Sequence, residues 1–147
     1  MTVSPRRFRD AIGTFPTGVA VVTTSGPAGL TTSAVTSLSL DPVLLLVCFD
    51  NDSRTLPLVR DSGRFAVNVL RAGQEELARV FASKRVAEEK FAAVTHESVD
   101  GVLAWFLCDV RELLPGGDHT IGVGAVRDLD FDPDGDPLVF VRGGFAG

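Results

Sequence analysis

Hydroxyl side chains gather in one short stretch of the sequence, between two apolar runs. Six of the nine residues from position 31 to 39 carry a hydroxyl group: Thr31, Thr32, Ser33, Thr36, Ser37 and Ser39. An ordinary loop has more Gly, Pro, Asn or charge. An ordinary core strand has fewer hydroxyls, because each buried one needs a partner. Small residues with side-chain and backbone donors suit a shelf for a flat polar ligand. A half-exposed Thr/Ser-rich strand is the plainer interpretation, and composition alone favours it.

A second group of candidate residues is Ser53-Arg54-Thr55, which follows the polar cluster at 50–52 and opens a predicted helix over Arg54 to Asp61. Two hydroxyls, a guanidinium and the free N–H groups of a helix start are suited to binding a phosphate. The alternative is an ordinary serine cap followed by a solvated arginine. Taken alone, the motif favours the cap.

Two further segments pair a polar side chain with glycine. His119 follows Gly117-Asp118 at the start of a predicted strand, where it is either a turn histidine or a side chain held at a barrel rim. Arg142 ends a predicted strand, and Gly143 after it lets a backbone or a ligand approach closely. The polar segment around Ser83 is the remaining candidate.

Several well-known sites are missing from the sequence. It has no Gly-Lys-Ser/Thr phosphate loop, no Gly-x-Gly-x-x-Gly opening a helix and no Gly-x-Ser-x-Gly elbow. No Cys/His cluster has the spacing of metal ligands, so no metal is expected. Cys48 and Cys108 lie inside apolar runs and are interpreted as buried free thiols.

Composition limits the class of protein. The chain has 147 residues, enough for one domain with a real core, and we expect a single domain over 1–147. The net charge of −5 argues against a nucleic-acid surface, which needs a basic stripe. There is no apolar run of about 18 residues and no signal-peptide pattern at the N-terminus. We therefore expect a cytoplasmic protein without a membrane span.

The hydrophobic pattern predicts a mainly β protein. Ser4-Pro5 is typical of a helix start, and Phe8, Ala11, Ile12 and Phe15 follow at helical spacing. Strands are predicted over 19–24, 31–39, 43–49, 65–70, 102–110, 119–127 and 138–141, and further helices over 74–81 and 83–91. The count and the hairpin-like spacing favour an antiparallel β-barrel with a few short peripheral helices.

Taken together, these segments resemble the short-chain flavin reductases, in order and spacing through nearly the whole chain. The resemblance rests on Phe8-Arg9, Phe15 to Thr24, Thr36 to Pro42, Ser53-Arg54-Thr55, Ser62 to Leu70, Lys90-Phe91-Ala92, Gly117-Asp118-His119 and Arg142-Gly143. Each piece is weak alone, but together in register they are a strong signal.

The resemblance implies an antiparallel split β-barrel of the FMN-binding, Greek-key type, in a homodimer with the flavin at or near the subunit interface. It implies reduction of FMN, or FAD, by NADH or NADPH, and supply of the reduced flavin to a partner monooxygenase. Two other functions stay open: a redox enzyme that keeps FMN as a fixed prosthetic group, and a non-catalytic flavin or heme binder.

The resemblance also assigns site residues. The isoalloxazine ring would lie along Thr32, Ser33, Ala34, Val35 and Thr36. The ribityl chain and phosphate would contact Leu38, Ser39, Ser53, Arg54 and Thr55, and Phe81 and Ser83 would close over the flavin tail. The nicotinamide nucleotide would contact His119, Phe140, Val141, Arg142 and Gly143. His119, the predicted catalytic residue, would orient the nicotinamide or help protonate reduced flavin.

Elementary chemistry agrees with this assignment. Hydride transfer between two flat rings needs reacting atoms stacked at about 3–3.5 Å and little acid–base help from the protein. Small shelf residues permit that stacking. The sequence departs from the family in a short Ala93–Gly101 segment, and Val141 and Phe145 stand where tyrosines are frequent. The choice between FMN and FAD, and between NADH and NADPH, stays open.

Overall fold

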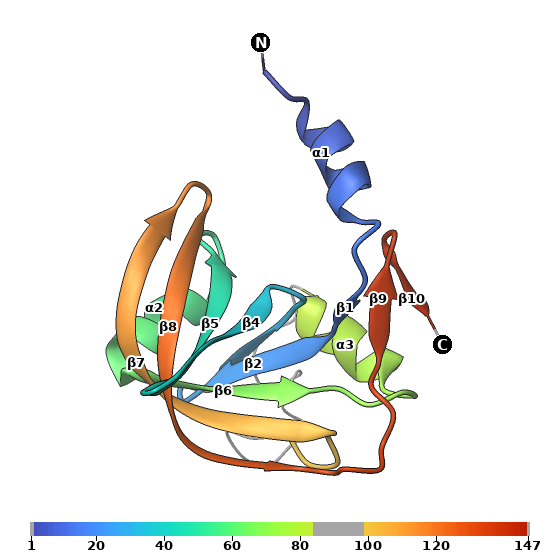
Figure 1. Ribbon diagram of the computed structural model, residues 1–147. Coiled ribbons are helices and arrows are strands. Elements are labelled where there is room, and N and C mark those ends of the chain that lie inside the picture. The colour runs from blue at the N-terminus through green and yellow to red at the C-terminus, as the bar shows by residue number, and fades with distance from the viewer. Residues whose placement is uncertain (1, 84–98, 147) are drawn as a thin grey trace.

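The computed structural model describes residues 2–83 and 99–146, and this part of the chain is mainly β-strand (Figure 1). Its helices are α1 (Pro5–Ile12), α2 (Thr55–Ser62) and α3 (Glu75–Ala82). Its strands are β1 (Thr17–Gly18), β2 (Ala20–Thr24), β3 (Ala28–Thr32), β4 (Val35–Leu40), β5 (Val43–Asp50), β6 (Arg64–Val69), β7 (Ala104–Gly116), β8 (His119–Phe131), β9 (Val139–Val141) and β10 (Gly144–Ala146).

Two antiparallel sheets organise these strands. Seven strands form one curved sheet in the order β3-β2-β6-β7-β8-β5-β4, and β1, β9 and β10 form a small sheet beside it. The two edge strands of the large sheet, β3 and β4, are consecutive in sequence, yet they do not pair with each other. The sheet is thus split between them. The predicted class, a mainly β antiparallel fold with a few short helices, is confirmed.

The hydroxyl-rich stretch is two strands, and the prediction of a single strand over 31–39 is wrong. β3 ends at Thr32 and β4 begins at Val35. The cause is local: the backbone N–H of Ala34 donates to the Thr32 hydroxyl at 2.9 Å instead of to a neighbouring strand. Threonine side chains compete with strand ladders in this way.

The hairpin of β7 and β8 is longer than its predicted strands over 102–110 and 119–127. The strands pair as far as Gly116 with His119, so only Gly117 and Asp118 form the turn. Gly117 takes a left-handed conformation (φ 69°), which a two-residue hairpin turn requires. Strands β1 and β10 were not predicted, because two or three residues carry no periodic signal. Most of the predicted helix over 83–91 falls within 84–98, outside the described residues, and so does the Lys90-Phe91-Ala92 motif.

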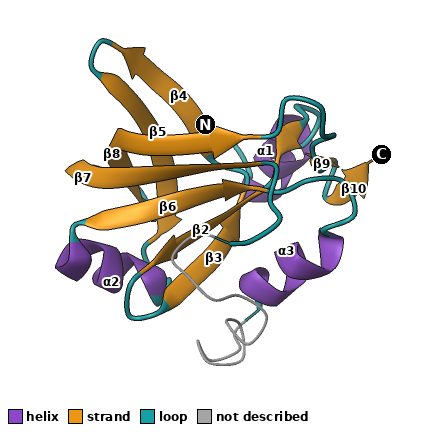
Figure 2. Cartoon of the chain, turned by 90° about the horizontal axis from the view of Figure 1, so that it is seen from below, coloured by secondary structure: helices purple, strands orange, loops and turns teal. Residues whose placement is uncertain are grey.

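Apolar side chains fill both faces of the large sheet. On β2, Val22 belongs to one core cluster with Phe49, Phe65 and α2, and its neighbour Val21 belongs to a second cluster beneath α3. This alternation is the expected pattern for a strand covered on both sides. In Figure 2, α2 lies at the left of the β2–β3 region and α3 at its right. The two clusters fix the positions of the helices that border the candidate site.

Helix α1 has the predicted start but no buried residue. Ser4 caps it, with its Oγ accepting from the Arg7 N–H at 3.1 Å. Phe8 is 60% exposed and Ile12 54% exposed. Figure 1 shows α1 extending away from both sheets. The apolar face predicted from the spacing exists, and nothing in the described chain covers it. Each described helix has eight residues, too short to cross a bilayer.

Candidate functional site

The link between β3 and β4 is fixed to the neighbouring strand β5. The backbone N–H of Cys48 donates to the carbonyl of Ala34 at 3.0 Å, just where the ladder of β4 begins. On the other side, the Thr31 hydroxyl donates to the Ala78 carbonyl at 2.6 Å and attaches α3. The predicted shelf therefore begins at a rigid corner, and Thr31 is structural.

From this corner, β4 runs as an open polar edge. Thr36 and Ser37 are exposed, and a bulge between Ser37 and Ser39 leaves Leu38 half exposed. Among the described residues, the hydroxyls of Thr36 and Ser39 make local hydrogen bonds, to the Ser37 carbonyl and from the Asp41 N–H. Because β4 is an edge strand of the described sheet, its outer backbone groups have no partner strand within 2–83 and 99–146. This edge can offer hydrogen bonds to a flat ligand, so the predicted ring contacts at 32–36 stay geometrically open.

The start of α2 fits both interpretations made from the sequence. Ser53 Oγ accepts from the Leu56 N–H at 3.2 Å, so Ser53 does cap the helix. Thr55 is buried at 3% exposure, so its predicted ligand contact stays a prediction. Arg54 is exposed and forms no ion pair within the described ranges. An uncommitted guanidinium beside a helix start is the arrangement that binds phosphate.

Asn51 ties the turn of the β7–β8 hairpin to the loop before α2. Its backbone N–H donates to the Asp118 carbonyl at 3.0 Å, and its Nδ2 donates to the Gly117 carbonyl at 3.3 Å. The Thr120 hydroxyl donates to Asn51 Oδ1 at 2.6 Å. These bonds bring the predicted residue His119 to the side of the molecule that carries Ser53 and Arg54. Asn51 was not predicted, since its sequence signal is only that of a turn.

His119 is held by its neighbour. Its Nδ1 lies 2.7 Å from Asp118 Oδ1, and the imidazole is 41% exposed. The hydrogen bond from His119, and then its charge, lower the pKa of the Asp118 carboxyl below its ordinary value. With Nδ1 engaged, Nε2 is the nitrogen left to meet a ligand.

Strand β5 joins these pieces into one region. Ala34 is bonded to Cys48, and Asp50, two residues further along β5, pairs with His119. Two residues of strand span about 7 Å. The corner of the shelf and the held histidine therefore flank the same end of β5, on its two opposite sides.

The segment Phe140 to Gly143, predicted to contact the nicotinamide nucleotide, lies away from His119. Phe140 pairs with Thr17, and the Arg142 N–H donates to the Gly13 carbonyl at 2.7 Å. Arg142 has a left-handed backbone (φ 51°), followed by Gly143 (φ 77°), which makes the tight β9–β10 turn. Figures 1 and 2 show β9 and β10 on the side of the molecule away from the β7–β8 hairpin. Within one described chain, no hydrogen bond or strand pairing joins this segment to His119.

The two residues predicted to close over the flavin tail differ in placement. Phe81 is 1% exposed and packs in the core under α3, where a methyl group on Gly29 would lie 2.7 Å from its ring. Ser83 ends α3, and its hydroxyl donates to the Val80 carbonyl at 2.6 Å. Phe81 thus supports the helix. A flavin contact by either residue stays a prediction.

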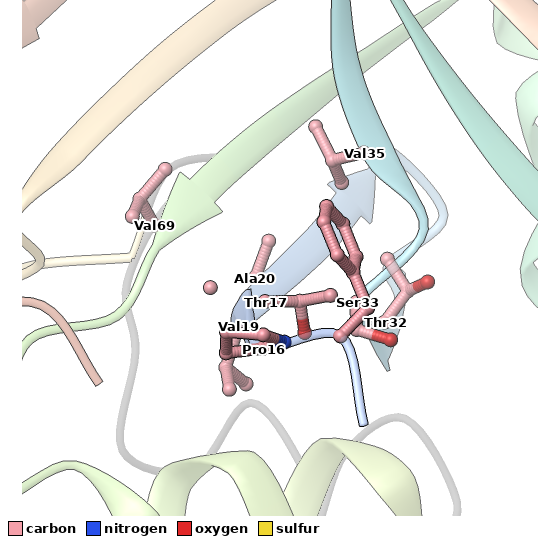
Figure 3. Close-up of a pocket in the computed structure, with 10 residues that line it drawn as sticks. Pro16, Thr17, Val19, Ala20, Thr32, Ser33, Val35 and Val69 are labelled. Atoms are coloured by element: carbon pink, nitrogen blue, oxygen red, sulfur yellow. The ribbon is translucent and has the colours of Figure 1, made fainter. Parts of the chain in front are cut away.

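A cavity of about 270 Å³ lies beside the corner of the shelf (Figure 3). It joins three shelf residues to a segment that was not predicted as part of the site. Its lining consists of Thr32, Ser33 and Val35 from the shelf, Val69 from β6, and Phe15, Pro16, Thr17, Gly18, Val19 and Ala20. Apolar side chains make up most of the wall and hydroxyls the remainder, which suits a flat ring with one polar edge. Within 2–83 and 99–146, no three His, Cys, Asp or Glu side chains are grouped to hold a metal.

Comparison with known proteins decides the family. Residues 12–147 match the flavin reductase like domain. The chain belongs to this family. The resemblance stated from the sequence is thereby confirmed.

Individual relatives agree. A probable flavin reductase of Rhizobium meliloti (strain 1021) is 42% identical over 153 residues; the match covers 96% of this chain but only 48% of that protein, about half its length. The reductase subunit HsaB of a flavin-dependent monooxygenase from Mycobacterium tuberculosis is 36% identical over 157 residues, covering 99% and 83% of the two chains. The solved NADH:FAD oxidoreductase SgcE6 of Streptomyces globisporus superposes with a TM-score of 0.91 at 36% identity, covering 99% and 96%.

Proposed function

We propose that this flavin reductase family member is an NAD(P)H-dependent flavin reductase that passes reduced FMN or FAD to a separate monooxygenase. The observation that carries the proposal is the match to the flavin reductase like domain over residues 12–147. The relatives are consistent with it: HsaB is a monooxygenase reductase subunit, and SgcE6 has been solved with NAD and FAD fragments.

The residues present fit a flavin ring. The cavity offers apolar wall from Val35 and Val69, and hydroxyls from Thr32 and Ser33. Beside it, the open edge of β4 presents backbone donors and acceptors. A bound flavin supplies the hydride acceptor, and the protein has to hold the two rings face to face. No strongly basic or acidic cluster is needed for that step.

The phosphate end of the ligand is assigned to the start of α2. Arg54 is exposed and the first N–H groups of α2 lie beside it. Ser53 is committed to its helix cap through the Leu56 N–H, so its contact with a phosphate would come through its backbone or as a second bond of its hydroxyl. The positive charge of Arg54 and the direction of the first N–H groups of α2 both favour an anion at this position.

His119 is assigned a positioning role toward the nicotinamide nucleotide. Asp118 fixes Nδ1 at 2.7 Å, which sets the direction of the ring. Nε2 can then hydrogen-bond with the nucleotide or deliver a proton to reduced flavin. The residues Phe140 to Gly143 stay predicted contacts of the same nucleotide, although the small sheet that carries them lies away from His119 in one chain.

A homodimer is the assembly that best accounts for the exposed apolar groups. Helix α1 has no buried residue, and a free helix of eight residues is marginal in water. Val3 is 73% exposed, Phe8 60% and Leu40 90%. A second copy of the chain that covers α1 would explain both its order and its apolar face.

The test is steady-state oxidation of NADH and NADPH by the purified protein with free FMN or FAD in excess. A flavin reductase oxidises the nicotinamide at a rate that saturates with free flavin. Absence of oxidation with every pairing of nucleotide and flavin contradicts the proposal. Tightly bound FMN, with turnover only when an organic acceptor is added, indicates a fixed prosthetic group instead.

A further inference from the structure

Thr17 carries a polar atom that the fold leaves unsatisfied. Its Oγ1 is buried, and within the part of the chain that the structure describes it has no hydrogen-bond partner. Buried hydroxyls nearly always have one, because an unmet hydrogen bond opposes folding. Of its neighbours around the cavity, Thr32 accepts from the Ala34 N–H, so its hydroxyl is in use. A valine would fill the place of Thr17 without that cost, which suggests that its partner is a ligand.

Gly18 is the next residue, and neither packing against described residues nor backbone conformation requires a glycine there. A methyl group built on it meets no other atom within 4 Å, and its backbone is not in the left-handed region. The glycines of β8 are different: a methyl group on Gly122 or Gly124 would lie 2.7 Å from the ring of Phe49 or Phe65, whereas Gly144 of β10 has open space like Gly18. Packing therefore explains the glycines of β8 and does not explain Gly18.

Both residues lie between the two predicted halves of the site. They line the same cavity as Ser33 and Val35 of the shelf, as Figure 3 shows for Thr17, Ser33 and Val35. On its other side, Thr17 pairs with Phe140, the first residue assigned to the nicotinamide nucleotide. Strand β1 therefore lies between residues assigned to the flavin ring and a residue assigned to the nicotinamide nucleotide.

We infer that β1 is part of the ring-binding site, and this inference rests on the proposed flavin reductase function. The Thr17 hydroxyl hydrogen-bonds with the amide-type edge of a flat heteroaromatic ring in the cavity, and Gly18 leaves clearance for that ring. The pyrimidine edge of a flavin and the carboxamide of a nicotinamide share this chemistry, a carbonyl beside an N–H. A hydroxyl can donate to the carbonyl and accept from the N–H.

The test uses the full chain with Thr17→Val, Thr17→Ser and Gly18→Val. Thr14→Val is the matched control, because the exposed Thr14 hydroxyl three residues upstream donates to the Ala11 carbonyl. The readouts are the flavin dissociation constant from flavin fluorescence, the NADH dissociation constant from NADH fluorescence, and the melting temperature of the ligand-free protein.

We expect Thr17→Val to weaken one of the two ligands about five- to tenfold, the usual effect of one lost hydrogen bond. Its melting temperature should equal or exceed that of the wild type, since no bond within the fold is lost. Thr17→Ser should restore binding, and Gly18→Val should weaken binding more strongly while the protein stays folded. Weaker flavin binding alone assigns the hydroxyl to the flavin edge, and weaker NADH binding alone assigns it to the carboxamide.

Two results overturn the inference. One is wild-type affinity for both ligands in Thr17→Val and Gly18→Val. The other is a Thr17→Val protein that melts at a lower temperature than the wild type, because the hydroxyl then has a partner in the fold. A wild-type protein that binds neither flavin nor NADH is a distinct outcome, which contradicts the proposed function itself and this inference with it.

Discussion

The hydroxyl of Thr120 donates to the side-chain carbonyl of Asn51 at 2.6 Å, across 69 positions of sequence. Thr120 is 6% exposed, so the bond is shielded from water. Together with the bond from Asn51 Nδ2 to the Gly117 carbonyl, it fixes the hairpin that presents His119 to the loop before α2. The placement of the predicted catalytic histidine therefore depends on an asparagine outside the predicted site.

Replacing Asn51 with alanine should loosen this hairpin. Two side-chain hydrogen bonds are lost and the Thr120 hydroxyl is left buried without a partner, which should cost about 2 kcal/mol of unfolding free energy. Because His119 is then less well placed, kcat/KM for NAD(P)H should fall about tenfold. Urea denaturation and steady-state kinetics measure the two effects. Asn51→Asp keeps the acceptor for Thr120 and should lose less unfolding free energy and less kcat/KM than Asn51→Ala. Equal losses in the two variants would contradict this account.

His119→Ala should lower kcat/KM for the nicotinamide nucleotide about tenfold while leaving flavin affinity close to the wild-type value, because the imidazole is assigned to the nucleotide. Full NAD(P)H turnover in this variant would remove His119 from the mechanism. Asp118→Asn should reproduce part of the loss, since the carboxylate that fixes Nδ1 is gone.

The pH dependence of the Asp118–His119 pair follows from the lowered pKa of Asp118. Its folded-state pKa lies below the ordinary value of 3.8, so the stabilisation is present above that value and is lost as the pH falls through the folded-state pKa. The Asp118 contribution to kcat/KM should consequently stay constant from neutral pH down to about pH 5. The measurement is the wild-type to Asp118→Asn ratio of kcat/KM across this range, and a ratio that collapses well above pH 5 contradicts the assignment.

Cys108 should resist alkylation in the folded protein. Burial, and then the charge of Asp109, raise the pKa of its thiol from 9.0 to about 12, so almost no thiolate exists near neutral pH. Iodoacetamide followed by mass spectrometry should label Cys108 only after unfolding. Above pH 9 the unfolded chain releases this proton and the folded chain does not, so stability should fall by up to about 1.4 kcal/mol per pH unit until about pH 12. Cys108→Ser should remove that slope, and an unchanged slope would place its origin elsewhere.

Phe8→Ser with Ile12→Ser should shift the proposed homodimer toward monomer without unfolding the chain, because neither side chain is buried in one copy. At about 1.5 kcal/mol for each apolar side chain, counted in both copies, the dimer should weaken by roughly four powers of ten. Light scattering during gel filtration gives the mass. The control is Arg6→Ser with Asp10→Ser, on the opposite side of α1, which should leave the assembly unchanged. A wild-type monomer contradicts the homodimer.

Local signals were sufficient for some elements and not for others. Ser4-Pro5 and the spacing of Phe8 and Ile12 predicted α1 correctly, because a cap and a helical period are short-range features. Nothing short-range could show that α1 packs on no described residue, since that depends on the rest of the fold. The break after Thr32 was missed for a related reason. The Thr32 hydroxyl accepts a hydrogen bond from the Ala34 N–H, but the composition of the segment is still typical of a strand.

In the candidate site, too, some residues have a local sequence signal and others depend on long-range contacts. The motifs around Ser53 and His119 stand out by residue type, and the structure brings their segments to one region through β5 and Asn51. Asn51 and Thr17 carry no such signal. Their roles come from pairing with Thr120 and Phe140, each more than 60 positions away. Long-range register of this kind is not encoded in local periodicity.

Substitution of Arg54 distinguishes binding of the flavin phosphate from binding of the flavin ring. Its guanidinium is exposed and has no ion-pair partner among the described residues, so Arg54→Ala should leave the unfolding free energy within about 0.5 kcal/mol of the wild type. It should weaken FMN about tenfold, because a charge-assisted hydrogen bond to phosphate is lost. Riboflavin has the same ring and no phosphate, so its affinity should not change. Fluorescence titration of both flavins against wild type, Arg54→Ala and the control Arg60→Ala, at the other end of α2, measures this. Equal weakening of FMN and riboflavin would show that Arg54 acts on the ring or on the fold, and unchanged FMN affinity would remove the phosphate from the start of α2.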